Sequence, residues 1–305
     1  MNITSVTPDL GYIHTAIVNL YFYGQPGAGD RNWVLIDAGM PGFAGAIERA
    51  AARRFGENAR PLAIVLTHGH FDHVGSLRTL ADRWGAPIFA HPLELPYLTG
   101  RSAYPPADPT VGGGANAMMS PLFPRGPFDF RPLVRALPDD GTLPGMPDWR
   151  WIHTPGHSPG HVSLFRESEG TLVVGDAFVT TKQESLLASL TNRRELHGPP
   201  SYYTPDWWMA RDSVERLAAL EPEIAATGHG PPMRGYQLRT GLSELARNFD
   251  RLAVPRRGRY VGSPATAGLE GVVSVPPPVR SPAAPLVMGL AVAAVAGALV
   301  LRGRR

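Results

Sequence analysis

Three histidines and an aspartate crowd into the stretch 65–76, VLTHGHFDHVGS, as His68, His70, Asp72 and His73. These residue types usually lie at or near the surface, so their crowding needs a chemical reason. The preceding run 61–66 is short, apolar and rich in branched residues, which predicts a buried strand. Segment 77–84 has apolar residues at helical spacing before Gly85, which predicts a helix with a glycine C-cap. The cluster therefore occupies a strand-to-helix loop, where α/β proteins collect ligands and catalytic groups.

The spacing within this loop indicates metal binding. Side chains alternate along an extended chain, so His68 and His70 point to the same side. Asp72 and His73 lie past the turn and can face a second point nearby. Two pairs of ligands suit two metal ions a few ångströms apart, and four such residues at one strand end disfavour a solvated loop with chance histidines. Neutral imidazole and carboxylate groups suit zinc and also admit iron or manganese.

Three later stretches place ligand-type residues where apolar strands run into glycine-rich loops. His157 lies in HTPGHSPGHVSLF between two strand-like segments, Asp176 ends the run TLVVGDAF, and His229 follows a short apolar run in EIAATGHGPP. All three share the local setting of the first cluster. The sequence around Ser158 resembles a nucleophile elbow only superficially, because Pro159 stands where that motif begins a helix.

The order of these motifs resembles the metallo-β-lactamase-fold metallo-hydrolase superfamily over roughly residues 18–232, most nearly its glyoxalase II-like branch. The resemblance implies an α/β protein with an αββα sandwich. It implies a first metal ion on His68, His70 and His157, and a second on Asp72, His73 and His229, with Asp176 bridging the two. It places Asp37, in WVLIDAG, and His161 beside the site as residues that support the ligands.

This set of residues predicts a hydrolase with two divalent metal ions, zinc first and iron or manganese next. Two cations bridged by Asp176 would share a water and lower its pKa toward neutrality, which provides a hydroxide nucleophile. Asp72 is the candidate catalytic residue, because it could orient that nucleophile and pass a proton to the leaving group. We expect a small-molecule substrate with an ester, thioester or lactone-type bond. The alternative is a metal-dependent oxidoreductase of the sulfur dioxygenase or diiron type, which shares the fold.

The charge distribution argues against a nucleic-acid enzyme. Residues 251–305 hold eight arginines and one acid and so carry +7, whereas the whole chain carries +3, which leaves −4 on residues 1–250. An acidic body lacks the basic face that binds nucleic acid. His229 follows Asp176 by only 53 positions, too few for the extra domain of the superfamily's nuclease branches. Because the chain has no cysteine, we expect neither disulfides nor thiolate metal sites.

Three residues are candidates for substrate binding. Lys182 is the only lysine and lies six residues past Asp176, where basic residues bind substrate carboxylates in the glutathione-thioester branch. Tyr202 and Tyr203 either line the pocket or pack a helix against the sheet; that helix is predicted to start with Thr204 as its N-cap. The Pro/Gly-rich segment 92–132 is either a wall of the substrate pocket or a loop that packs on itself.

The sequence divides into a catalytic domain over 1–252, a Pro/Gly-rich flexible linker over 253–282 and an apolar segment over 283–301. The last has 19 residues without a charge, and as a helix it would span about 28 Å, close to the thickness of a bilayer core. We expect a C-terminal transmembrane helix, with a helix docked on the domain as the alternative. The N-terminus lacks signal-peptide features, so we expect a cytoplasmic catalytic domain anchored to the membrane. The small-residue stripe Gly289, Ala293 and Gly297 favours a homodimer through this helix.

Overall fold

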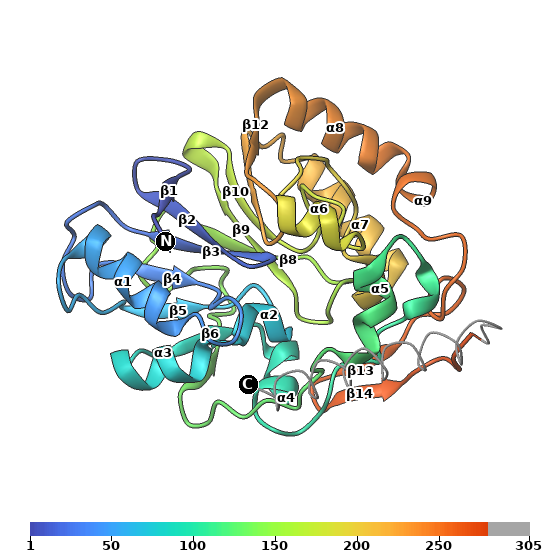
Figure 1. Ribbon diagram of the computed structural model, residues 1–305, viewed down its shortest axis with the longest axis horizontal. Coiled ribbons are helices and arrows are strands. Elements are labelled where there is room, and N and C mark those ends of the chain that lie inside the picture. The colour runs from blue at the N-terminus through green and yellow to red at the C-terminus, as the bar shows by residue number, and fades with distance from the viewer. Residues whose placement is uncertain (280–305) are drawn as a thin grey trace, which may run out of the picture.

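Two mixed β-sheets pack face to face in the computed structural model, which describes residues 1–279 (Figure 1). The first sheet consists, in order across it, of β1 (Thr4–Ser5), β2 (Leu10–Thr15), β3 (Val18–Tyr23), β4 (Val34–Ile36), β5 (Ala63–Val65), β6 (Ile88–Ala90) and β7 (Val134–Ala136). The second consists of β12 (Met233–Arg234), β11 (Ile224–Thr227), β10 (Thr171–Gly175), β9 (Val162–Arg166) and β8 (Arg150–His153). Strands β4 to β7 run parallel, as do β10 and β11, whereas the other neighbours are antiparallel.

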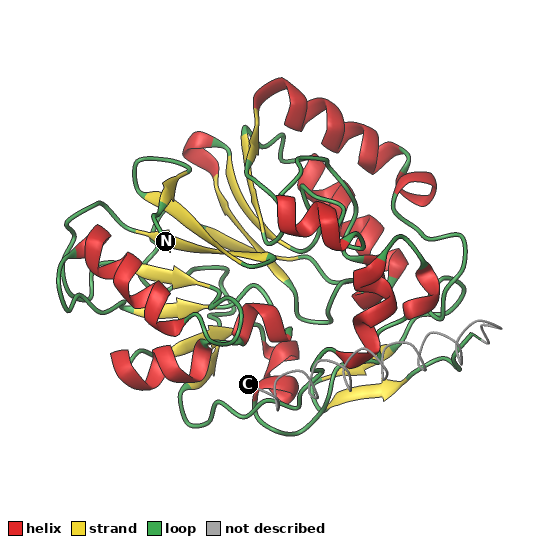
Figure 2. Ribbon diagram, viewed as in Figure 1, coloured by secondary structure: helices red, strands yellow, loops and turns green. Residues whose placement is uncertain are grey.

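Helices cover the outer face of each sheet (Figure 2), which confirms the α/β sandwich. Helices α1 (Ala44–Phe55) and α3 (Leu77–Trp84) pack on the first sheet, and α7 (Trp207–Ala218) and α8 (Gly235–Arg247) pack on the second. The shorter helices are α2 (Phe71–Val74), α4 (Leu95–Leu98), α5 (Ala115–Met119), α6 (Leu186–Thr191) and α9 (Phe249–Leu252).

Alternation along the central strands builds three core layers. Leu35 and Ile64 point into the layer shared with α1 and α3, whereas Val34 and Val65 point between the sheets. Leu172 and Val174 of β10 likewise face α7 and α8. Because both faces of these strands are buried, their sequences are continuous apolar runs without a polar side. The predicted strand over 61–66 is β5, and the helix predicted before Gly85 is α3, with Gly85 in the left-handed conformation at φ +55°.

The start of α7 differs from the sequence prediction. Thr204 does not cap this helix, because its hydroxyl donates to the carbonyl of Pro200 at 2.8 Å. Asp206 is the N-cap instead, and its Oδ1 accepts hydrogen bonds from the backbone of Trp208 at 3.0 Å and Met209 at 2.9 Å. A carboxylate that takes two free amide groups satisfies the helix terminus more fully than one hydroxyl would.

The Pro/Gly-rich segment 92–132 is folded into short helical turns. They are the 3₁₀ turns η1 (Pro92–Glu94), η2 (Pro109–Val111) and η3 (Ser120–Leu122), together with α4 and α5. Tyr97 and Tyr104 are buried and stack with ring centroids 4.0 Å apart, whereas Met118 is half exposed. Phe123 packs against Phe71 of α2. The segment therefore joins the body of the domain beside the loop that carries the first cluster.

The described part of the predicted linker, residues 253–279, packs on the domain. Tyr260 is 4% exposed, and its hydroxyl donates to the carbonyl of Pro106 at 2.6 Å. Strands β13 (Thr266–Gly268) and β14 (Gly271–Ser274) form a hairpin below α5 (Figure 1). Its Pro/Gly-rich composition predicted flexibility, whereas the structure has a buried aromatic ring and a hairpin in this stretch.

The predicted transmembrane helix, 283–301, lies outside the described residues. Within residues 1–279, no helix combines the length and apolar character needed to cross a bilayer.

Candidate metal centre

The predicted ligands all lie just beyond strand ends, at one edge of the sandwich. The loop after β5 carries His68 and His70, and the short helix α2 that follows carries Asp72 and His73. His157 lies between β8 and β9, Asp176 directly follows β10, and His229 follows β11 by two residues. All seven side chains are buried, and Asp72 is the most exposed at 7%. The fold thus brings together residues from four separate stretches of the sequence.

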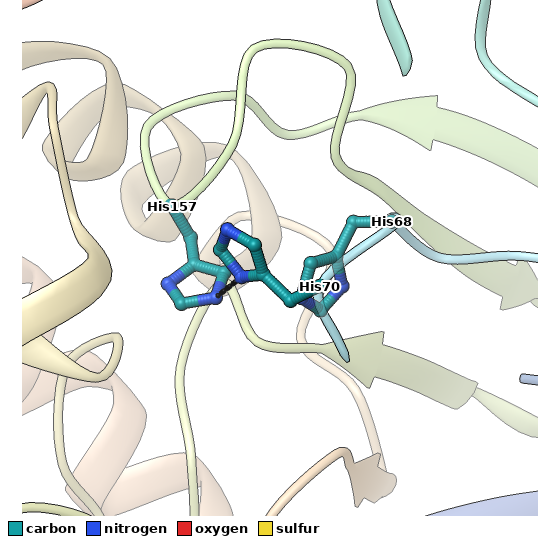
Figure 3. Close-up of side chains that lie close together, drawn as sticks. All are labelled: His68, His70 and His157. Carbon is teal, nitrogen blue, oxygen red and sulfur yellow. Dashed lines mark hydrogen bonds between the residues drawn. The ribbon is translucent and has the colours of Figure 1, made fainter. Parts of the chain in front are cut away.

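The first group consists of three histidines, His68, His70 and His157, each with a ring nitrogen within 4.8 Å of the others (Figure 3). His70 Nδ1 and His157 Nε2 are 2.9 Å apart. Burial lowers the pKa of His70 to about 3 and holds the pKa values of His68 and His157 well below their usual range. The group therefore presents neutral imidazoles, which is the form that binds a metal ion.

The second group consists of Asp72, His73 and His229, whose ligand atoms also lie within 4.8 Å of one another. His73 Nδ1 contacts Asp37 Oδ2 at 2.8 Å, and His229 Nδ1 contacts the carbonyl of Ile17 at 2.6 Å. Each oxygen accepts a hydrogen bond from the N–H at Nδ1 and so leaves Nε2 of the ring available to a metal.

Charge distinguishes the second group from the first. Burial opposes protonation of His73, but the carboxylates of Asp176 and Asp37 outweigh it and raise the pKa of His73 well above its usual value. Burial likewise opposes protonation of His229, and Asp176 again outweighs it and raises the pKa of that ring. Burial raises the pKa of Asp72.

Asp176 lies between the two groups. Its Oδ2 is 3.0 Å from His229 Nε2 and 3.5 Å from His157 Nε2, and its Oδ1 is 3.6 Å from His73 Nε2. Burial raises the pKa of Asp176, but His229 and His73 outweigh it and hold that pKa well below its usual range. Asp176 is therefore an ionised carboxylate in contact with a histidine of each group.

Asp37 and His161 lie behind the ligands, where the resemblance placed them. Asp37 accepts hydrogen bonds from the backbone and hydroxyl of Thr67, each at 2.8 Å, besides its contact with His73. Its backbone is left-handed, with φ +61°, which is uncommon for a residue other than glycine and typical of functional sites. His161 Nε2 accepts from the backbone N–H of Asp176 at 2.8 Å, and its Nδ1 contacts Thr154 Oγ1. Because both of its ring nitrogens are engaged, His161 orients Asp176 and offers no free ligand atom.

The buried atoms that lack hydrogen bonds fit a metal site. Within residues 1–279, His68 Nε2, His73 Nε2 and Asp176 Oδ1 have no hydrogen-bond partner. Each such atom costs about 1–3 kcal/mol when left unsatisfied, so several in one place indicate atoms kept for a ligand. Imidazole nitrogens and carboxylate oxygens suit Zn²⁺, and they also accept iron or manganese.

The three substrate-binding candidates occupy different surroundings. The ring of Tyr203 stacks on His70 with centroids 4.7 Å apart, and within the described residues its buried hydroxyl has no partner. Tyr202 packs beside it in a cluster with Phe71 and residues of segment 92–132. Lys182 is exposed and lines a surface pocket of about 250 Å³ with His197 and Arg256. None of the seven predicted ligands lines that pocket, so the structure does not bring Lys182 together with them.

Sequence reasoning missed Glu94, which ends η1 just after β6. It is completely buried and accepts hydrogen bonds from the two loops that carry His68, His70 and His157. One donor is Ser158, whose side chain is thereby engaged away from any nucleophilic role. The only sequence signal was a glutamate in an apolar, Pro-rich turn after a parallel strand, and such residues are rarely buried unless they are paired.

Comparisons with known proteins agree with this geometry. Residues 16–229 match the family model of the Metallo-beta-lactamase superfamily. The chain is 46% identical over 260 residues to "Probable metallo-hydrolase YflN" of Bacillus subtilis (strain 168), covering 83% of this chain and 98% of that relative. It is 32% identical over 196 residues to "Probable metallo-hydrolase YybB" of the same organism, covering 64% and 74%. Among solved structures, BLEG-1 B3 metallo-beta-lactamase is 27% identical with a TM-score of 0.53, covering 77% of this chain and 99% of that one. The span matched by the family model contains all seven predicted ligands.

Proposed function

Because the chain belongs to the metallo-beta-lactamase superfamily, we propose that it is a hydrolase that binds two divalent metal ions and cleaves an ester, thioester or lactone-type bond in a small molecule. The observation that carries the proposal is the ionised carboxylate of Asp176 in contact with both groups of buried ligands. Zinc is the expected metal, since every donor is an imidazole or a carboxylate. A relationship to the glyoxalase II-like branch belongs to the same proposal.

The residues of the site have different proposed roles. His68, His70 and His157 would hold one ion, Asp72, His73 and His229 the other, and Asp176 both. Two such ions, when bound, lower the pKa of a shared water and polarise the oxygen of the bond to be cleaved. Asp72 is the most exposed of the seven ligands. Its ionised carboxylate can accept a proton and pass it to the leaving group.

The surroundings of the first group favour a substrate with an apolar part. Phe71, Phe123, Tyr202 and Tyr203 form a continuous apolar and aromatic cluster beside it. The ring of Tyr203 stacks on His70, and its hydroxyl, which has no partner within residues 1–279, can donate a hydrogen bond to a substrate oxygen. A contact with Lys182 would require a substrate whose anionic end reaches the separate pocket of that residue.

Metal analysis combined with a substrate panel tests the proposal. We expect two metal ions per purified chain and turnover of at least one small ester, thioester or lactone, lost on chelation and restored by Zn²⁺. A phosphodiester, RNA and DNA serve as negative controls. If the purified active protein holds a single iron and hydrolyses none of these substrates, the oxidoreductase proposal replaces the hydrolase proposal. Robust cleavage of RNA or DNA without small-molecule turnover would overturn the substrate class.

We also propose that the full chain is membrane-associated through 283–301, with the catalytic domain in the cytoplasm and with dimers formed through that segment. Support comes from 19 uncharged residues and from the small-residue stripe within them. Deletion of 283–305 should move the protein from the membrane fraction to the supernatant with unchanged turnover per chain. A full-length protein that fractionates wholly with the supernatant as a monomer would refute the anchor.

A further inference from the structure

One buried carboxylate joins the two loops of the first ligand group. Glu94 Oε2 accepts from the backbone N–H of Gly69 at 2.9 Å, between His68 and His70. Glu94 Oε1 accepts from the hydroxyl of Ser158 and the backbone N–H of Gly160, both at 2.8 Å, just after His157. One oxygen therefore holds each loop, although the loops lie almost ninety positions apart in the sequence.

The packing around Glu94 leaves the two loops little freedom. Its Oε2 also accepts a short hydrogen bond from the hydroxyl of Tyr104, whose ring lies against His70 with centroids 4.6 Å apart. A side chain at Gly69 would collide with Tyr104 and Leu98, and a Cβ at Gly160 would lie 2.7 Å from the backbone nitrogen of Glu94. Both glycines thus allow the loops to approach the carboxylate closely.

The second ligand group has different supports. Asp37 holds His73 and the carbonyl of Ile17 holds His229, and Glu94 contacts neither ring. The two oxygens of Glu94 accept from two backbone N–H groups, which can only donate, and from two hydroxyls. A glutamine of the same size would turn an NH₂ group toward the donors of one loop and so lose that loop's hydrogen bonds.

We propose that Glu94 is the positioning residue of the first metal site, because it clamps the His68–His70 loop to the His157 loop at the separation that one metal ion requires. This inference rests on the proposed metal-binding function and deepens it. Outer-shell partners of metal ligands typically contribute 10–100-fold to metal affinity. Because the hydrogen bonds of Glu94 reach the loops of the first group, we expect its contribution at that site.

The test measures Zn²⁺ affinity in single-site backgrounds of the full-length protein. His229→Ala retains the first group and His157→Ala retains the second. Each metal-stripped protein is titrated with Zn²⁺ against a chromophoric chelator. Glu94→Gln should weaken binding about 10–100-fold in the His229→Ala background and leave the His157→Ala background within about twofold, because Glu94 has no hydrogen bond to a ligand of the second group or to the loop beside it. Asp37→Asn is the counterpart at the second group and should weaken the His157→Ala background more than the His229→Ala background. A smaller loss is expected in the His229→Ala background, because Asp37 also holds Thr67, whose hydroxyl contacts His68 Nδ1.

Two further measurements separate positioning from general stability. A merely structural Glu94 would lower the melting temperature of both metal-free backgrounds and leave both Zn²⁺ affinities unchanged, which would overturn the proposal. If Glu94→Gln does not fold, Ser158→Ala and Tyr104→Phe each remove one donor and should weaken only the first site, by a smaller factor. Unchanged affinity in both of them would also overturn it. If the unsubstituted protein binds no Zn²⁺, the proposed function fails and this inference fails with it; if His229→Ala binds Zn²⁺ equally with and without Glu94→Gln, only this inference fails.

Discussion

The two ligand groups occupy the same edge of the sandwich but differ in charge. The first consists of three neutral histidines whose pKa values burial holds low. The second combines Asp72 with two histidines whose pKa values nearby carboxylates raise. A metal ion can enter the first group near neutral pH without displacing protons, whereas entry into the second releases them. Two ligand groups at the same edge of the sandwich therefore differ in the protonation of their histidines.

Removal of Asp176 should have the largest effect, because both groups share it. We expect Asp176→Ala to abolish turnover and to lower the metal content at both groups. Metal analysis and single-turnover assays of the purified variant check this. Asp140→Ala is a matched control, since Asp140 is exposed and contacts only Thr142. Retention of two tightly bound metal ions by Asp176→Ala would show that the groups do not share this ligand.

Removal of one histidine from each group should separate them. We expect His157→Ala and His229→Ala each to keep one metal ion per chain and to lose most turnover, because the remaining three-residue group still offers a nearly complete site. Metal stoichiometry after dialysis is the measurement. If either variant loses both metal ions, the two groups form one indivisible site and the comparison between them is wrong.

The pH dependence of metal binding should differ between the groups. His73 and His229 have raised pKa values in the folded protein, so they hold protons near neutral pH that a metal ion must displace. Zn²⁺ affinity of the second group should therefore fall as pH falls, by about tenfold per pH unit for each proton released. The first group, with lowered pKa values, should change little between pH 6.5 and 7.5. Zn²⁺ titrations of His157→Ala and His229→Ala at these two pH values check this. An equal change of Zn²⁺ affinity in both variants would contradict the expected difference.

Tyr203→Phe should have the smallest effect. It keeps the stacked ring on His70 and removes only the hydroxyl, so metal affinity at both groups should be unchanged. If the hydroxyl binds substrate, the loss of one hydrogen bond should lower kcat/KM about 2–12-fold. Steady-state kinetics beside Tyr236→Phe, whose ring is 76% exposed, provide the comparison. Identical kcat/KM in the two variants would remove Tyr203 from the substrate pocket.

Local patterns predicted the elements that carry the site but not every boundary. The strand over 61–66 and the helix before Gly85 follow from apolar periodicity, which depends on neighbouring residues only. The N-cap of α7 was misplaced because Thr204 and Asp206 both have capping side chains and compete. The packing of segment 253–279 could not be predicted from its composition, because its contacts are with residues far away in the sequence, such as that of Tyr260 with Pro106.

The sequence by itself determined which side chains offer ligand atoms and that they follow strand ends. The spacing within one loop identifies four of them, His68, His70, Asp72 and His73. Any fold that keeps this strand and helix also keeps that spacing. The tertiary structure alone decided the partners of those ligands: Asp37 for His73, the Ile17 carbonyl for His229 and Glu94 for the first group's two loops. The pKa of each histidine follows from these partners and from burial. Contacts across dozens of residues depend on how sheets and loops pack, and no local pattern encodes that arrangement.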